Sequence, residues 1–146
     1  MEELKLSLKT LLANQFVMYF KAHSYHWNVE GINFSQYHDF FAEIYSDVYG
    51  SIDKTAEYLR ILDDYAPRSI SEMYAHKSIP EDDEEPQSVS TMLLKLSLAN
   101  EEVLNNLNKL FTTATAANEH SIADYAAARL DSHKKHKWML RSSLKD

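Results

Sequence analysis

The chain contains no cysteine, only two glycines and only three prolines among its 146 residues. Without cysteine there is no disulfide framework and no thiolate metal ligand, so any metal would have to be bound by histidine or carboxylate side chains. Glycine and proline are the usual turn residues of β-rich folds, and their scarcity favours an all-α fold. Apolar residues make up 45% of the chain, so residues 1–146 are expected to form a single domain with a sizeable core.

From the sequence we expect neither a membrane span nor a secretory leader, and the chain is acidic rather than basic. No apolar run approaches the roughly 20 residues that cross a bilayer. The first residues, Met1–Leu4, are acidic rather than basic, so they do not resemble a signal peptide and a cytoplasmic location is expected. The formal net charge of −7 argues against nucleic-acid binding, because phosphate contacts depend on clustered Lys and Arg. It suits a surface or cavity that gathers cations.

Apolar periodicity predicts four long helices, at residues 2–27, 34–63, 89–113 and 118–143. Asn33 and Asn118 are expected to cap the second and the fourth, and Gln36 stands at the third position of a capping box. Residues 64–88 break the pattern and are too many for an ordinary connection between helices. A crossover that carries a short helix at residues 71–76 would join two helical hairpins into a four-helix bundle.

Several apolar residues of the second and third long helices are expected to lie in the core. On the second helix, Tyr45 and Tyr49 fall on one apolar face and are interpreted as core residues. On the third, Leu94 and Leu98 are assigned to the core with the neighbouring leucines. A glycine inside a helix costs about 1 kcal/mol relative to alanine, so Gly50 predicts the close approach of another helix.

Four side chains form a candidate metal site: His26, His38, Asp53 and Glu57. His26 and His38 flank the turn between the first two helices, while Asp53 and Glu57, four residues apart, share one face of the second helix. The helix between His38 and Asp53 spans about 22 Å, whereas metal–ligand bonds are about 2 Å long. A single chain therefore cannot close the site. Two copies can, if their second helices pack antiparallel across a two-fold axis.

A mixed set of His and carboxylate ligands suits Fe(II) among other divalent metals. Spacing alone leaves a structural interpretation open for each of these residues. A histidine near a helix end is commonly a cap or a satisfied core residue, and an Asp/Glu pair four residues apart is commonly a solvated face. His133 and His136 are interpreted as part of the polar end of the last helix.

The segment from His23 to His38, which reads HSYHWNVEGINFSQYH, resembles the ferroxidase signature of the Dps family of mini-ferritins. The segment Asp53–Glu57, DKTAE, matches that family's D-x-x-A-E segment, and the crossover and the last helix are also similar. The resemblance implies a ferritin-like four-helix bundle that assembles into a homodimer across a two-fold axis and then a homododecameric shell. It also implies that Fe(II) is oxidised at sites between subunits, typically by hydrogen peroxide, and stored inside as ferric mineral.

Carried over to this sequence, the resemblance makes His26 and His38 iron ligands from one subunit, and Asp53 and Glu57 iron ligands from its partner. Each site would bind one or two non-haem iron ions. Ala42 stands where the family usually has an aspartate, which weakens the second iron position. The resemblance therefore also admits a protein with weakened or lost ferroxidase activity, in a structural or metal-sequestering role.

A third function, DNA compaction, is associated in this family with a lysine-rich tail. Here the N-terminal segment offers only Lys5 and Lys9, and both fall within the first predicted helix. Together with the net charge of −7, this predicts that DNA is not bound.

Overall fold

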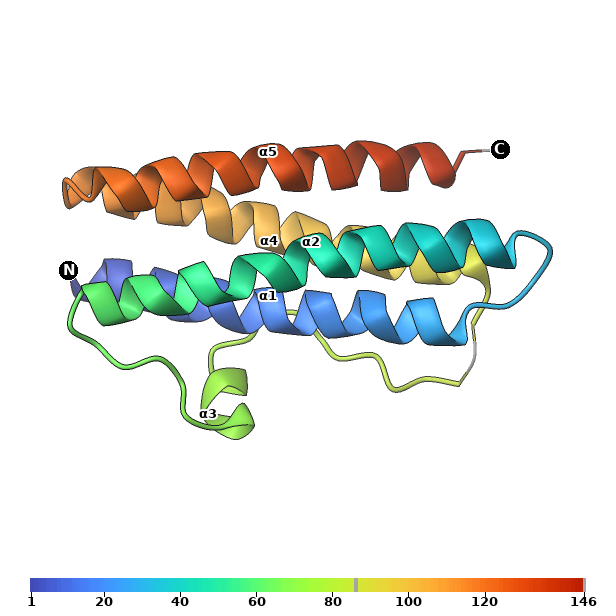
Figure 1. The fold of residues 1–146 in the computed structure, drawn as a ribbon, viewed down its shortest axis with the longest axis horizontal. Helices are drawn as coiled ribbons and strands as arrows, with labels where there is room; N and C mark the ends of the chain where they lie inside the picture. Colours follow the sequence, from blue (N-terminus) through green and yellow to red (C-terminus); the bar gives the residue numbers. More distant parts are fainter. Residues whose placement is uncertain (86, 146) are drawn as a thin grey trace.

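The computed structural model describes residues 1–85 and 87–145, which are helical and contain no strand. The helices, in chain order, are α1 Glu2–Asn28, α2 Phe34–Ile61, α3 Ile70–Tyr74, α4 Val89–Ala116 and α5 His120–Ser143. The four long helices lie side by side along the long axis of the molecule, and the crossover with α3 passes along the α1 side (Figure 1). The predicted all-α four-helix bundle, with a long crossover carrying a short helix, is confirmed.

The helix ends follow local capping chemistry, although the expected caps were partly wrong. The hydroxyl groups of Ser69 and Ser88 each accept a backbone N–H three residues later and so start α3 and α4. Asn33 occupies the N-cap position of α2 but makes no side-chain cap hydrogen bond. Asn118 has a φ of +59° and ends the α4–α5 turn, so that Glu119 rather than Asn118 precedes α5. Asparagine tolerates this left-handed conformation, which explains its use in a chain reversal.

The core is built from the apolar stripes of all four long helices. Among its largest fully buried side chains are Leu8 and Leu11 of α1, Phe41 and Leu59 of α2, Leu96 and Leu107 of α4, and Ile122 of α5. Burying a side chain of this size contributes about 1.5 to 3 kcal/mol relative to leaving it exposed. The bundle is therefore held mainly by interdigitated leucine and aromatic side chains.

The face of α2 that enters the core agrees only in part with the predicted one: Phe41 and Leu59, expected there, are fully buried, but Tyr49 is not. The buried residues of α2 follow the register Phe41, Ile44, Val48 and Thr55, whereas Tyr49 is 60% exposed. Tyr45 is half-buried and lies between the buried face and the exposed face of α2. Leu94 and Leu98 of α4 were also expected in the core, and they are 51% and 63% exposed. In both helices apolar residues occupy two adjacent faces, so periodicity alone did not separate the buried face from the exposed one.

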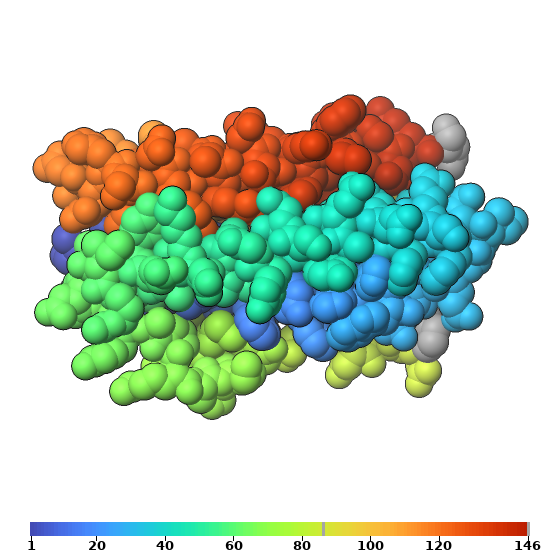
Figure 2. Space-filling view, in the orientation of Figure 1, coloured from blue at the N-terminus to red at the C-terminus, as the bar shows by residue number. Residues whose placement is uncertain are grey.

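The outer face of α2 is not covered by any other segment that the structure describes. Figure 2 shows α2, in teal to green, running uncovered across the middle of the molecule between α5 and the crossover. A Cβ added at Gly50 would meet nothing within 4 Å, so the close helix approach that this glycine predicted does not occur within one chain. The exposed face of α2 is thus left available for a second molecule.

A buried polar cluster connects α2, α4 and α5 inside the bundle. The Asp47 carboxylate accepts two hydrogen bonds from the Arg129 guanidinium, at 3.0 and 2.9 Å, and one from His136 Nε2 at 2.7 Å. His133, fully buried, contacts Arg129 through Nε2 and Asn100 through Nδ1. The interpretation of His133 and His136 as a polar helix end was therefore wrong, because both point into the bundle.

Candidate metal centre

The turn between α1 and α2 brings His26 and His38 into direct contact. Val29, buried and in an extended conformation, ends α1, and Gly31, with a φ of +124°, supplies the positive φ that the reversal needs. Twelve residues apart in sequence, the two imidazole rings stack with their centroids 3.7 Å apart and their planes within 17°. The predicted half-site at this end of the bundle is thus formed by the turn itself.

Hydrogen bonds fix which ring nitrogens can bind a metal. His26 Nδ1 lies 2.6 Å from the backbone carbonyl of His38, and His38 Nδ1 lies 2.7 Å from the backbone carbonyl of His26. A carbonyl oxygen only accepts, so both Nδ1 atoms carry a proton, and only Nε2 of each ring can offer a lone pair to a metal. Neither Nε2 has a hydrogen-bond partner among the residues that the structure describes. This second-sphere arrangement is the one that metal-binding histidines use.

Aromatic side chains surround the histidine pair. Phe34 stacks on the His38 ring with the centroids 5.0 Å apart. His23, one turn before His26, lies between the rings of Tyr45 and Trp27, whose centroids are 3.9 and 4.2 Å from its own. Burial, followed by the nearby His26, lowers the pKa of His23, which favours its neutral form. The half-site therefore has a rigid, largely aromatic wall.

The two predicted carboxylate ligands lie farther along α2. Asp53 and Glu57 are both exposed, one turn apart, and neither forms an ion pair or a side-chain hydrogen bond within residues 1–85 and 87–145. The helix between His38 and Asp53 is continuous, and at 1.5 Å per residue it separates them by about 22 Å. The structure thus brings His26 and His38 together but does not bring Asp53 and Glu57 to them.

No group of three or more His, Asp or Glu side chains that could hold one metal ion occurs in the described part of a single chain. This agrees with the helix-length argument, which requires ligands from two copies. Ala42, one turn after His38, is half-buried and offers no donor atom. A metal site at His26 and His38 that included carboxylate ligands would therefore need them from elsewhere.

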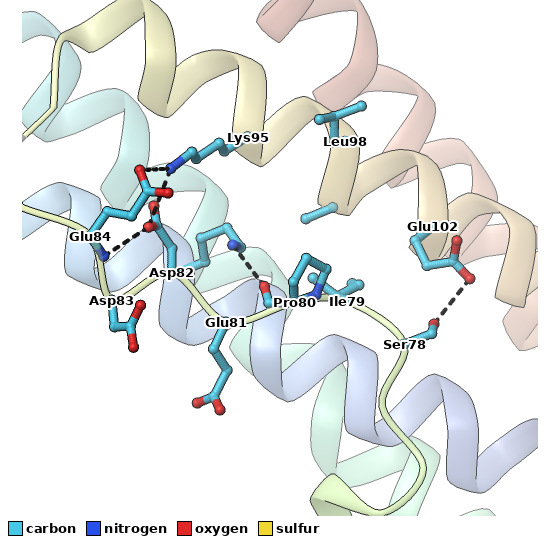
Figure 3. A pocket seen from close by; sticks show the side chains of 12 residues that line it. Ser78, Ile79, Pro80, Glu81, Asp82, Asp83, Glu84, Lys95, Leu98 and Glu102 are labelled. Atoms are coloured by element: carbon cyan, nitrogen blue, oxygen red, sulfur yellow. Dashed lines mark hydrogen bonds and ion pairs between the residues drawn. The ribbon is translucent and has the colours of Figure 1, made fainter.

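A pocket in the described part of the chain lies apart from the histidines. It measures about 410 Å³ and is lined by the acidic segment 78–84 of the crossover and by α4 (Figure 3). Asp82 accepts hydrogen bonds from Tyr25, at 2.6 Å, and from Lys95, at 3.3 Å, while Lys95 also pairs with Glu84 at 2.9 Å. Lys21 donates to the Pro80 carbonyl at 3.0 Å. These charges hold the crossover against α1 and α4, so a structural role accounts for them.

Among the described residues, no helix has the length and apolar character that a membrane span requires. The ferritin-like domain family model matches residues 6–146 of the chain. A DNA protection during starvation protein from Brevibacillus brevis is 30% identical over 139 residues, which cover 94% of this chain and 91% of that protein. These comparisons extend over nearly the full chain, not only over the histidine motif.

Solved structures agree with the sequence comparisons. Dps from Thermosynechococcus elongatus superimposes with a TM-score of 0.95 at 26% identity, covering 99% of this chain and 92% of that one. A Dps protein from Vibrio cholerae O1 gives a TM-score of 0.93, also at 26% identity, covering 99% of this chain and 90% of that one. The bundle, the crossover and the motif at the α1–α2 turn lead to one assignment: the chain belongs to the ferritin-like family, as a mini-ferritin of the Dps type.

Proposed function

We propose that this mini-ferritin binds Fe(II) at sites shared between two copies of the chain, oxidises it with hydrogen peroxide, and stores the ferric product inside a shell of twelve copies. The observation that carries the proposal is the reciprocal pair of hydrogen bonds between His26 and His38. It directs both Nδ1–H groups to carbonyl oxygens and leaves Nε2 of each ring as the atom that would bind a divalent metal. The similar Vibrio cholerae protein is described as a member of a superfamily of ferritin-like diiron-carboxylate proteins.

The second half of the site would come from the α2 helix of a partner copy. If two α2 helices pack antiparallel across a two-fold axis, Asp53 and Glu57 of each approach His38 of the other, and two equivalent sites form. Gly50, whose side lies open in one chain, would allow the two helix backbones to approach closely. Carboxylate oxygens are hard ligands, and their negative charge stabilises Fe(III) relative to Fe(II). The partner's carboxylates would therefore favour oxidation of the iron that the imidazoles help to bind.

The test exploits the sharing of each site between copies. His26→Ala and Glu57→Gln should each abolish peroxide-dependent Fe(II) oxidation and lower Co(II) affinity, whereas His120→Ala and Asp131→Asn, at exposed positions of α5, should leave both unchanged. If the two inactive variants are denatured together and refolded, each mixed pair regains one intact site, so about one quarter of the sites should recover. Failure to recover any activity, in variants that refold alone with native helicity, would contradict a shared site.

Ala42 supports a second candidate, in which metal is bound without efficient oxidation. One carboxylate fewer leaves four proposed ligands, enough for one well-held ion. Stoichiometric Co(II) binding with no peroxide-dependent Fe(II) oxidation would favour this sequestering role. No DNA-binding role is proposed, because Lys9 already pairs with Asp64 at 2.9 Å and Lys5 with Glu2 at 3.6 Å, and both lysines lie within α1.

A further inference from the structure

Helix α2 has a bend-prone point between the two ends of the proposed site. Gly50 and Ser51 stand next to each other in this helix, and such Gly/Ser pairs are typical sites of sharp helix bends. The Ser51 hydroxyl donates to the Val48 carbonyl at 2.6 Å, so the serine competes for an acceptor of the helix itself. His38 precedes this point, whereas Asp53 follows it. The direction of α2 between these two residues is therefore only weakly fixed by α2 alone.

A buried hydroxyl of α5 contacts the helix at this point. Tyr125 Oη donates to the Ser51 carbonyl at 2.8 Å and lies 2.6 Å from Thr55 Oγ1. Because a hydroxyl has one proton and a carbonyl only accepts, Thr55 is the donor of the second bond. From α1, Gln15 Nε2 donates to Ser51 Oγ at 3.0 Å and to Tyr125 Oη at 3.3 Å. All four side chains are buried, and together they connect three helices.

We propose that Tyr125 is a positioning residue for the carboxylates Asp53 and Glu57, an inference that rests on the proposed function. Ser51 and Thr55 are buried, and each is two residues away from Asp53, which is exposed. Two residues along a helix correspond to about 200° around its axis, so these neighbours lie on nearly opposite sides. Tyr125 therefore holds, from inside the bundle, the turn of α2 whose outer side carries the two carboxylates.

The precision that a shared metal site requires explains why a bend-prone helix needs such a contact. His38 lies twelve residues before Gly50, which is about 18 Å along the helix axis. With that lever, a change of about 10° at Gly50 would move His38 by about 3 Å relative to Asp53. Metal–ligand bonds are about 2 Å long, so a shift of that size would separate the ligands. Because the two sites of a two-fold pair are equivalent, both would be weakened together.

Tyr58 provides a matched control, because its hydroxyl bonds to α5 rather than to α2. Tyr58 Oη donates to the Ser121 carbonyl at 3.3 Å. Tyr58 and Tyr125 are 6% and 7% exposed, and their ring centroids are 5.4 Å apart. Lys54 Nζ lies 5.9 and 5.7 Å from the two centroids, and phenylalanine would keep a ring at either position. Each Tyr→Phe change thus removes one buried hydroxyl between α2 and α5, but only the change at Tyr125 releases the bend-prone point.

The experiment compares Tyr125→Phe with Tyr58→Phe in the assembled protein. Hydrogen–deuterium exchange of the metal-free protein reports on local opening of α2. Titration with Co(II) gives the affinity of the shared site, and the visible absorption spectrum of bound Co(II) reports on its ligand geometry. Urea unfolding gives the stability of each variant, which separates a change in the site from a general loss of stability.

Tyr125→Phe should exchange the amides of residues 52–57 faster than the wild type and change the Co(II) spectrum. Its Co(II) affinity should fall about tenfold, as is usual when a contact that orients metal ligands is lost. Tyr58→Phe should keep the exchange, the spectrum and the affinity of the wild type. Thr55→Val, which also loses a bond to Tyr125, should show the same changes in weaker form even if Tyr125→Phe does not fold. Thr55→Ser keeps the hydroxyl and should behave like the wild type.

Wild-type Co(II) affinity and spectrum in both Tyr125→Phe and Thr55→Val would overturn this inference and leave the proposed function standing. Equal changes in Tyr58→Phe would also overturn it, because they would show a general effect of packing between α2 and α5. If the wild type itself binds no Co(II) at a site that needs both His26 and Glu57, the proposed function is refuted together with this inference.

Discussion

Removal of the Asp47 carboxylate is the sharpest test of what fixes α2 within the bundle. Asp47 accepts three hydrogen bonds, two from Arg129 and one from His136, and both of these side chains are only 11% exposed. Arg129 Nε already lacks a partner in the described structure. In Asp47→Ala the guanidinium keeps a single contact, to His133, and becomes a buried charge without a counterion.

The expected loss of stability follows from these burials. Breaking a buried ion pair by deleting one partner costs about 3 to 5 kcal/mol, because the remaining charge is uncompensated. Asp47 itself is 34% exposed, so water can partly replace it, and the lower end, about 3 kcal/mol, is the appropriate figure. Asp39, exposed on the same helix and without an ion pair among the described residues, provides the matched control.

Urea unfolding followed by circular dichroism, at one fixed protein concentration because assembly is linked to folding, measures the difference. Asp39→Ala should stay within about 0.5 kcal/mol of the wild type, as surface substitutions usually do. Should Asp47→Ala also fall within that margin, with an unchanged m-value, the polar cluster would not be a significant constraint on α2.

Two further predictions concern acid stability and metal stoichiometry. Burial, more than any other cause, lowers the pKa of His133, so this side chain stays neutral in the folded state. In the unfolded chain the same side chain binds a proton below about pH 6.5. The contribution of His133 to the free energy of unfolding should therefore be fully present above that pH and fall progressively toward about pH 5. Burial opposes ionisation of Asp47, but hydrogen bonds from its two partners hold the pKa of the carboxyl well below its usual range, so its contribution is lost only as the pH falls below about 3.9. A urea midpoint that does not change between pH 8 and pH 5 would contradict the first of these statements. Ala42→Asp places a carboxylate one turn after His38 and should raise the number of Co(II) ions bound per site from one to two. Calorimetric titration measures this stoichiometry. An unchanged value would show that Ala42 is not the position that limits metal binding.

The proximity of His26 and His38 could be predicted because the geometry of the turn between them is local. His26 and His38 flank a turn whose direction is set by Gly31, and a reversal of that length necessarily places the two residues at the same end of the bundle. The reciprocal Nδ1–carbonyl bonds could not be predicted, since they depend on rotamers and on the separation of the two helix ends. The assignment of iron and of peroxide came from the family resemblance and not from spacing.

The buried polar cluster was missed although the sequence carried a signal for it. His133 and His136 follow Ala126 at steps of seven and ten residues and precede Leu140 by seven and four, which puts all four on one face of α5. Polar residues that fall on an apolar face at helical spacing are candidates for a satisfied buried network. Which of the acidic residues of α2 completes the network depends on how α2 and α5 pack, and periodicity does not fix that.

The helix α2 both packs into the bundle and carries three of the four proposed metal ligands, so its packing affects where those ligands lie. One face, with Phe41, Val48 and Asp47, is fixed to the rest of the bundle by apolar packing and by the polar cluster. The opposite side carries His38 near one end and Asp53 toward the other. Because a two-fold pair of such helices would form two equivalent sites, any bend between the two positions would change both sites equally. Asp47 lies between them in the sequence, so its ion pair to Arg129 stabilises the segment whose straightness would set the distance between the two proposed half-sites.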